Sequence, residues 1–273
     1  MDFKFSVVIA VYKNDNPEYF CQAFYSIINQ TIKPTEIILV IDGPIPLSIR
    51  DLVNNWKEQF GYLKVVESKV NLGHGKARRL GIENCSENII ALMDSDDISI
   101  PERFELQLNF LKENPDIKVL GGNIDEFENE ENNIVATRKV FSTDIEITQD
   151  LKRRCPINQM TVMFYKDIIQ NAGGYLDWYC NEDYYLWIRL KLNSVKFANL
   201  DKTLVKVRVD NNMYSRRGGL SYFKSEYKIQ RLLLEKKIID KSLFTKNVIV
   251  RLFVQVLSPN WLRKLIFINI VRR

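Results

Sequence analysis

The chain has 273 residues, of which 46% are apolar, so it can bury a sizeable core and is not expected to be disordered. The net charge is +5, from 39 basic and 34 acidic residues. A dedicated nucleic-acid-binding protein would be more strongly basic, so no nucleic-acid partner is expected. The four scattered cysteines and the single histidine exclude a dense disulfide scaffold and a multi-histidine metal site.

Short β-branched segments alternate with longer amphipathic segments through the first hundred residues. The predicted strands cover residues 5–12, 36–41, 63–66 and 88–93, and the predicted helices cover residues 17–30, 48–60 and 75–85. Strands one, two and four are apolar on both faces, as in a parallel sheet that helices cover. The alternation therefore predicts a doubly wound α/β fold.

The second half of the chain is less regular. A helix is expected to open at Pro101 and to run over residues 102–113, followed by irregular strands of a mixed sheet over residues 119–140. Another helix is predicted over residues 182–190, two short strands at 195–198 and 203–209, and helices from about Leu220. The sequence contains no internal repeat or obvious linker.

Polar loops follow three of the predicted strands, at the sheet edge where ligands of such folds bind. Asp94 and Asp96 come directly after the fourth strand, and in extended backbone residues two apart project to the same side. Two carboxylates so placed can hold Mn²⁺ or Mg²⁺, with phosphate oxygens and water completing the shell. A polar turn that caps the next helix is the alternative, but the position after this strand favours a metal site.

Two other segments suit a nucleotide. Asp42 follows the second strand, and its carboxylate can accept hydrogen bonds from a nucleobase, although Asp-Gly is also a common turn. Residues 71–81 combine glycines, a helix start and three cations, which suits an anionic ligand. A plain loop followed by a solvated helix face explains the second segment equally well.

Acidic and basic side chains in the second half are also candidates. Asp183, at the start of a predicted helix, can act as a general base if burial or a nearby diphosphate offsets the effect of the helix start on its pKa. Ordinary first-turn acids after an Asn181 cap are the alternative. Arg216 and Arg217 precede two glycines, either as a phosphate clamp or as a surface loop.

The end of the chain, residues 247–273, mixes apolar and basic side chains, so it either lies on an anionic membrane surface or packs on the core. Residues 1–15 lack the features of a signal peptide, and no apolar run approaches the ~20 residues that a spanning helix needs. A cytoplasmic location is therefore expected.

Six short motifs occur in an order and at intervals that resemble glycosyltransferase family 2, over roughly residues 4–210. These motifs are residues 7–12, 42–43, 71–73, 94–97, 121–122 and 182–183. A second set is similar to the branch of this family that builds bacterial surface polysaccharides. This set comprises residues 153–158, 161–164, 173–175, 182–187, 197–200 and 216–219.

The resemblance implies an A-type glycosyltransferase fold, with a Rossmann-like, mostly parallel mixed sheet flanked by helices, and inverting transfer of one sugar. It implies Asp183 as the catalytic base, Asp96 as the metal ligand, Asp42 as the reader of the base and Asp94 near the ribose or the metal. The expected donor-binding residues are Val11, Tyr12, Asp42, Asn71, Gly73, Lys76, Arg78, Asp94 and Ser95. Glu182, Trp187, Arg216 and Arg217 are expected at the acceptor or its diphosphate.

The resemblance also implies a catalytic domain over residues 1–215 and a helical extension over residues 216–273. Within the domain, residues 1–97 would form the nucleotide-sugar half and residues 98–215 the acceptor half. The donor favoured is a UDP-sugar. The acceptor expected is a hydroxyl of a polyprenyl-diphosphate-linked glycan at the inner membrane face, in O-antigen, capsule or exopolysaccharide synthesis, with peripheral membrane contact.

Processive members of this family combine spanning helices with a QxxRW motif, and neither is present, so single-sugar addition is expected. A sugar nucleotidyltransferase is an alternative, but it would carry a glycine-rich loop after the first strand, where residues 10–13 contain no glycine. A noncatalytic nucleotide-sugar-binding protein is the other alternative, and retention of Asp94, Asp96 and Asp183 argues against it.

Overall fold

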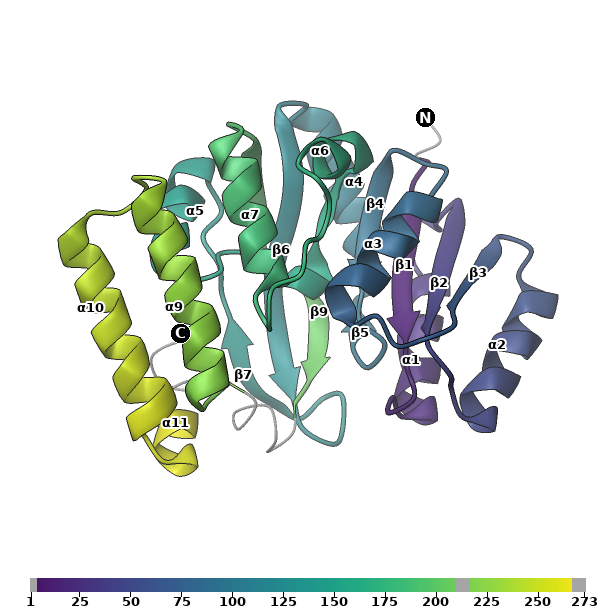
Figure 1. Cartoon of the computed structure of the whole chain (residues 1–273). Helices are drawn as coiled ribbons and strands as arrows, with labels where there is room; N and C mark the ends of the chain where they lie inside the picture. The colour runs from purple at the N-terminus through teal and green to yellow at the C-terminus, as the bar shows by residue number, and fades with distance from the viewer. Residues whose placement is uncertain (1–3, 210–216, 267–273) are drawn as a thin grey trace.

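A computed structural model describes residues 4–209 and 217–266 (Figure 1). In the first part of the chain the strands are β1 (Ser6–Val11), β2 (Glu36–Asp42), β3 (Leu63–Ser68) and β4 (Ile89–Met93). The helices between them are α1 (Pro17–Ile28), α2 (Leu47–Gln59) and α3 (His74–Asn84). The strand and helix alternation predicted from the sequence is confirmed here, with boundaries shifted by one or two residues.

The elements after β4 no longer alternate regularly between strand and helix. They are β5 (Ile98–Ser99), α4 (Arg103–Glu113), β6 (Ile117–Phe127), β7 (Ile134–Arg138), α5 (Asp144–Leu151), a 3₁₀ turn (Gln159–Thr161), β8 (Met163–Tyr165), α6 (Lys166–Asn171), α7 (Glu182–Leu192), β9 (Lys196–Arg208), α9 (Leu220–Glu235), α10 (Lys241–Arg251), a π-helical turn (Leu252–Leu257) and α11 (Asn260–Ile266). The prediction of two strands near residues 195–209 is wrong, because β9 is continuous and accommodates its polar centre through shifts in register against β6.

The described strands form one nine-stranded sheet in the order β3-β2-β1-β4-β8-β6-β9-β5, with β7 added beside β6. Strands β1 to β4 pair in parallel, whereas β8 runs antiparallel to both β4 and β6. Alternate side chains of β1 enter opposite cores: Val7 and Ile9 pack with α1, α2 and α4, and Val8 packs with α3, α7 and α9. Both sheet faces are therefore covered, as the apolar strands predicted.

The C-terminal helices pack against the second of these cores. Ile229 and Leu233 of α9 are fully buried in it, and the indole nitrogen of Trp178 donates a hydrogen bond to the Ser225 carbonyl. On α10, the Asn247 amide donates to the carbonyl oxygen of Lys152, just after α5. The extension is thus joined to the preceding residues by apolar and polar contacts, and its boundary near residue 216 stays a prediction.

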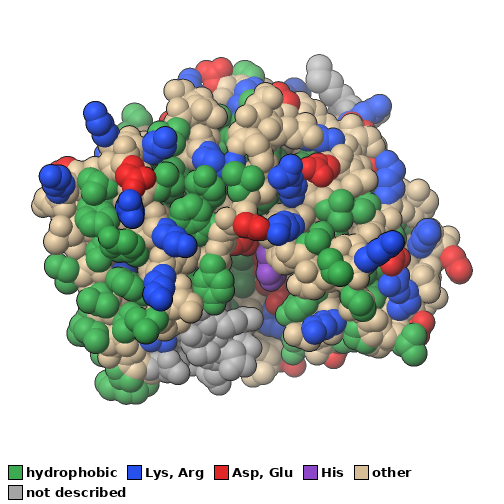
Figure 2. All heavy atoms as spheres, in the orientation of Figure 1, with side chains coloured by type: hydrophobic (Ala, Val, Ile, Leu, Met, Phe, Trp, Pro, Cys, Tyr) green, Lys and Arg blue, Asp and Glu red, His purple; other side chains and the backbone are tan. Residues whose placement is uncertain are grey.

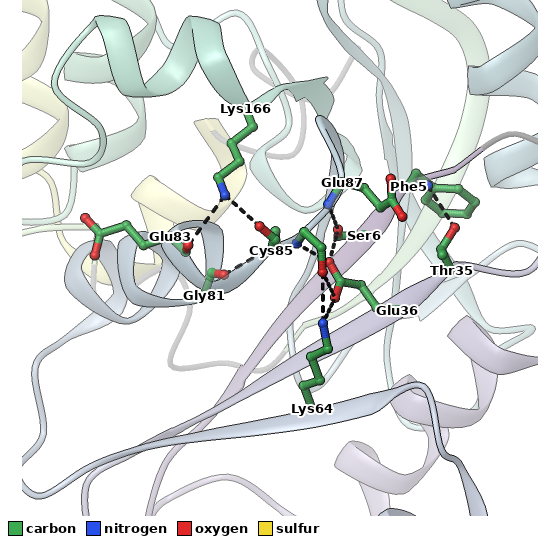
Figure 3. Close-up of polar contacts among 11 residues, drawn as sticks. Phe5, Ser6, Thr35, Glu36, Lys64, Gly81, Glu83, Cys85, Glu87 and Lys166 are labelled. Atoms are coloured by element: carbon green, nitrogen blue, oxygen red, sulfur yellow. Dashed lines mark hydrogen bonds and ion pairs between the residues drawn. The ribbon is translucent and has the colours of Figure 1, made fainter.

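Glu36, at the start of β2, lies among polar residues from the starts of the neighbouring strands (Figure 3). Its carboxylate accepts hydrogen bonds from the hydroxyl of Ser6 (2.6 Å), from Lys64 Nζ (2.5 Å) and from the backbone amide and the hydroxyl of Ser86. Burial alone would raise the pKa of Glu36, but these donors outweigh it and lower the pKa to about 2. The ionised carboxylate therefore holds the starts of three segments together.

Replacing Glu36 with glutamine should lower the free energy of unfolding at pH 7 by about 1–3 kcal/mol, because charge-assisted hydrogen bonds at a buried site are lost. The contribution of the ionised carboxylate is fully present above its ordinary pKa of 4.5 and disappears as the pH falls towards about 2. Urea unfolding at pH 7 and pH 3 measures both effects. The matched control is Glu83→Gln, which removes an exposed pair with Arg79, and an equal loss in both variants would contradict this role.

Candidate active site

The carboxyl ends of β1 and β4 open into a cleft of about 620 Å³. Its walls come from these strands, the N-terminal part of α3, the segment 154–160, the start of α7, and the helices α9 and α10 with the π-helical turn. Figure 2 shows this face hollowed between the regions that α3 and α7 occupy in Figure 1, with acidic side chains inside the hollow. Residues from almost the whole length of the chain therefore meet in one cavity.

The acidic segment after β4 forms one end of the cleft. The expected extended backbone is replaced by a turn at Ser95 and Asp96, yet Asp94 and Asp96 both line the cavity. Burial raises the pKa of Asp94, but the Arg78 guanidinium, 2.8 Å from its Oδ1, outweighs burial and holds the pKa below its usual value. The segment does not cap the next helix, because Asp97 instead accepts a hydrogen bond from the Arg208 backbone amide.

This end of the cleft fits a hard divalent cation. No group of three or more His, Cys, Asp or Glu side chains within residues 4–209 and 217–266 would hold a metal by itself. Such a cation is commonly held by one or two carboxylates together with phosphate oxygens. The carboxylates of Asp94 and Asp96 line this end of the cleft, and Asp96 is exposed. Burial and the negative charges of Asp96 and Asp94 raise the pKa of Asp97 well above its usual range, which marks an excess of negative charge here.

A buried arginine lies behind the acidic segment. Arg103 of α4 is fully buried, and its Nη2 donates a 2.8 Å hydrogen bond to the carbonyl oxygen of Leu92 in β4. Burial lowers the pKa of Arg103 to about 9, against the opposing effect of the negative charges of Asp94 and Asp97. The protein thus places its own positive charge beside these carboxylates.

Asp15 is a cleft residue that sequence reasoning did not single out, although it belongs to the polar loop after β1. Its Oδ2 accepts hydrogen bonds from the Ser95 hydroxyl (2.8 Å) and from the Tyr12 backbone amide (3.0 Å). Burial raises the pKa of Asp15 to about 6, with these two donors opposing the rise. Asp15 therefore ties the loop after β1 to the loop after β4.

Arg78 links the acidic segment after β4 to the start of α7. Its Nη2 bonds to Asp94, and its Nη1 lies 3.3 Å from Oε1 of Glu182 at the start of α7. Lys76, two residues earlier on α3, instead extends to Asp177 at 2.8 Å and does not line the cleft. Helical residues two positions apart face nearly opposite directions, which explains why only one of these two expected donor-binding cations reaches the cavity.

The Asp42 carboxylate is hydrogen-bonded to other residues of the protein and does not line the cavity. Its Oδ1 accepts a hydrogen bond from the Leu72 amide (2.6 Å), and its Oδ2 accepts from the Asn71 side chain and the Gly73 amide, both at 3.0 Å. A side chain at Gly43, which has a φ of +87°, would meet the Asn71 backbone at 2.7 Å. Asp42 thus fixes the loop before α3, and its contact with a nucleobase stays a prediction.

Asp183 also lines the cleft, in the first turn of α7. Its Oδ1 accepts a 2.6 Å hydrogen bond from the Tyr184 amide, and the Cys155 thiol lies 3.7 Å from its Oδ2. Burial and the nearby charge of Glu182 raise the pKa of Asp183 to about 6, and the backbone hydrogen bond and Arg78 only partly oppose the rise. Burial therefore outweighs the helix start and leaves a carboxylate suited to accept a proton near neutral pH.

If Asp183 is the proton acceptor, the rate of the reaction at saturating substrate should rise with pH through about 6 and then level off, because only the ionised carboxylate accepts a proton. A pH profile of kcat measures this limb. An Asp183→Glu variant should shift the midpoint of the limb, whereas a profile that is flat between pH 5 and pH 8 would exclude titration of this group.

The expected site residues divide by location. Those that line the cleft are Tyr12, Arg78, Asp94, Ser95, Asp96, Asp183 and Arg217. Val11, Asn71 and Gly73 do not line it, and Arg216 lies outside the described residues. The expectation that Trp187 contacts the acceptor does not fit its position, because it is fully buried against Phe197, one helical turn deeper than Asp183. His74, Arg138, Arg154 and Arg251 also line the cleft. His74 and Arg154 lie in segments noted in the sequence, 71–81 and 153–158, but none of the four was expected as a site residue.

The parallel strands β1 to β4, continued by a mixed half of the sheet and flanked by helices, form the A-type glycosyltransferase fold. A family model described as "Glycosyl transferase family 2" matches residues 6–170, and the chain belongs to this family. The resemblance in the sequence is therefore confirmed, and membership disfavours the nucleotidyltransferase alternative. Asp183 and the C-terminal wall lie beyond the matched residues.

Similar proteins support the same assignment. The amylovoran biosynthesis glycosyltransferase AmsE of Erwinia amylovora is 36% identical over 85% of this chain and 86% of its own length. The Escherichia coli UDP-Gal:alpha-D-GlcNAc-diphosphoundecaprenol beta-1,3-galactosyltransferase is 33% identical over 99% of this chain and 97% of its own. The mannosyltransferase PcManGT of Pyrobaculum calidifontis, solved with GDP-Man and Mn²⁺, shares the fold with a TM-score of 0.62 at 12% identity, covering 91% of this chain and 69% of that one.

Proposed function

We propose that this glycosyltransferase moves one sugar from a UDP-sugar to a hydroxyl of a polyprenyl-diphosphate-linked glycan, with inversion at the anomeric carbon, in the synthesis of a bacterial surface polysaccharide. The observation that carries the proposal is that Asp183, with its raised pKa, shares one cleft with Asp94 and Asp96. The name of the E. coli relative, a galactosyltransferase acting on a diphosphoundecaprenol-linked sugar, supports the donor and acceptor classes.

In this reaction Asp183 accepts the proton of the acceptor hydroxyl while the hydroxyl oxygen forms a bond to the anomeric carbon. The bond between that carbon and the diphosphate breaks on the opposite side, and the nucleoside diphosphate leaves with the electron pair. Arg78 keeps Glu182 and Asp94 in place, so the base and the acidic segment hold a fixed separation. Transfer of a single sugar follows each binding event.

Asp96, with Asp94 beside it, would hold a divalent cation, Mn²⁺ or Mg²⁺. When bound, the cation supplies neutralisation of the negative charge on the leaving diphosphate. The mannosyltransferase PcManGT, which shares the fold, is in complex with Mn²⁺ as well as GDP-Man, and this supports the use of a divalent cation here.

The test is release of nucleoside diphosphate from a panel of UDP-, GDP- and dTDP-sugars, with Mn²⁺ or chelator, in the presence of a pooled set of polyprenyl-diphosphate-linked sugars. Metal-dependent release of UDP, accompanied by a product one sugar larger, is the expected result. Donor binding without transfer to any acceptor would instead support the noncatalytic alternative. Release of pyrophosphate from a sugar phosphate and a nucleoside triphosphate would support a nucleotidyltransferase.

We also propose that the C-terminal helices contact an anionic membrane surface from the cytoplasmic side. None of the described helices has the length and apolarity needed to span a membrane. Exposed apolar side chains nevertheless gather on the C-terminal helices: Leu220, Tyr227, Ile249, Val250, Leu252, Phe253, Leu257 and Trp261. Figure 2 shows hydrophobic side chains over α9 and α10 with basic side chains between them, and Lys224, Lys228, Lys241 and Lys246 are exposed on these helices.

Replacing Phe253 and Trp261 together with serine should lower the fraction of protein that floats with vesicles of anionic phospholipid by about tenfold, because two exposed apolar anchors are removed. Flotation on a density gradient measures the bound fraction. The matched control is Leu47→Ser on α2, an apolar side chain that is 79% exposed far from these helices along the chain. Equal flotation of both variants, or no flotation of the unmodified protein, would exclude this surface as the membrane contact.

A further inference from the structure

Four arginines line the part of the cleft that surrounds Asp183. They are Arg138 at the end of β7, Arg154 after α5, Arg217 before α9 and Arg251 at the end of α10. The carboxylates that line this part are Glu226 and Asp183 itself, whereas Asp15, Asp94 and Asp96 lie around the loops after β1 and β4. The cleft therefore has an acidic end, suited to a cation, and a basic end, suited to an anion.

Contacts to the protein fix the positions of three of these guanidinium groups. Arg138 Nη2 donates to the Cys155 carbonyl at 2.8 Å, and Arg154 Nε lies 3.0 and 2.9 Å from the two oxygens of Asp150. Arg251 Nε lies 2.7 Å from Oε2 of Glu226. Arginine held in this way loses little freedom when it binds an anion, which favours tight and geometrically specific recognition.

The arginines of the basic end also lie near Asp183, the proposed proton acceptor. After burial and other nearby groups, the positive charge of Arg138 lowers the pKa of Asp183. Burial raises the pKa of Tyr222 of α9, and the charges of Arg217 and Asp183 also act on it, Arg217 lowering it and Asp183 raising it. A group bound among these arginines would therefore lie next to the acceptor hydroxyl that Asp183 deprotonates. The proposed function places the leaving nucleotide diphosphate at Asp96, so an anion bound among these arginines is a second one and belongs to the acceptor.

We infer that Arg138, Arg154 and Arg217 form a subsite for the diphosphate that links the acceptor sugar to its lipid, an inference that rests on the proposed function. Planar guanidinium groups bind phosphate oxygens in pairs, and several of them around one group match the charge of a diphosphate. Helix α10 places Arg251 in the cleft and exposes Ile249 and Val250 on the outer surface. The subsite thus adjoins the apolar surface at which a lipid tail would leave the protein.

The inference is tested with two acceptors that carry the same sugar, one linked to a long alkyl chain through a diphosphate and one linked to it directly as a neutral glycoside. Arg154→Gln should lower the ratio of kcat/KM for the diphosphate acceptor to that for the neutral glycoside by roughly 10- to 100-fold, as loss of charge-assisted hydrogen bonds predicts. Arg217→Gln, in the segment before α9, provides the same test if Arg154→Gln does not fold.

The matched control is Arg153→Gln, because the Arg153 side chain is exposed and does not line the cleft. An unchanged ratio in both Arg154→Gln and Arg217→Gln would overturn the subsite, as would a wild-type enzyme that uses the two acceptors equally well, and the proposed transfer would stand in either case. Failure of the wild-type enzyme to glycosylate either acceptor, with any donor of the panel, would overturn the proposed function and the subsite with it.

Discussion

Replacing Asp183 with asparagine is expected to lower kcat for sugar transfer roughly 10²- to 10⁴-fold while the protein still binds the UDP-sugar. Asparagine keeps the size of the side chain and can still accept the hydrogen bond from the Tyr184 amide, but it cannot take a proton. The donor's cation is proposed to bind at Asp96 and not at Asp183, so donor affinity should change little. Transfer rates and donor titration by calorimetry measure the two effects separately.

The control for this variant is Asp177→Asn, which changes an exposed carboxylate paired with Lys76 six residues before Asp183. It should retain transfer activity near that of the unmodified enzyme. A fully active Asp183→Asn enzyme would show that another group takes the proton. A variant that loses donor binding together with transfer would instead indicate that Asp183 acts on the nucleotide.

Replacing Asp96 with alanine is expected to lower transfer roughly 10²- to 10³-fold, which corresponds to the several kcal/mol that a bound cation contributes to stabilising a charged leaving group. Asp96 is exposed in the cleft, so its removal should cost little folding stability. A chelator should reduce the unmodified enzyme to a similar rate. Added Mn²⁺ should restore the chelated enzyme and leave the variant almost unchanged.

Asp116→Ala, which removes an exposed carboxylate paired with Lys196, is the control for this change and should respond to Mn²⁺ like the unmodified enzyme. If chelator has no effect on the unmodified enzyme, transfer does not depend on a metal. If Asp96→Ala remains fully activated by Mn²⁺, the cation is held elsewhere.

The fold and the position of the candidate site followed from local patterns in the sequence. Apolar strands that alternate with helices predict the parallel half of the sheet, and the topology of such sheets places the loop of Asp94 and Asp96 at the binding edge. The motif of Glu182 and Asp183 was also visible in the sequence, because acidic residues open a helix there. These features depend on neighbours in the chain, which is why the sequence alone reveals them.

The direction of individual side chains was harder to predict. Asp42 bonds to residues of the loop before α3, and Trp187 enters the core although it lies on the same helix as Asp183. Both outcomes depend on tertiary packing, which no motif records. The arginines of the basic end are spread from residue 138 to residue 251, so only the folded chain brings them together.

Arg78 and Arg103 bring positive charge to the acidic segment from two sides, one at the cleft and one within the core. Two arginines of the protein therefore balance part of the negative charge of this segment. The same arrangement would weaken the binding of a free cation at the proposed metal site, because one of the two carboxylates, Asp94, is already paired with Arg78. We accordingly expect the proposed cation to bind together with the nucleotide. Each catalytic cycle would then bring a new cation with the donor and release it with the nucleoside diphosphate.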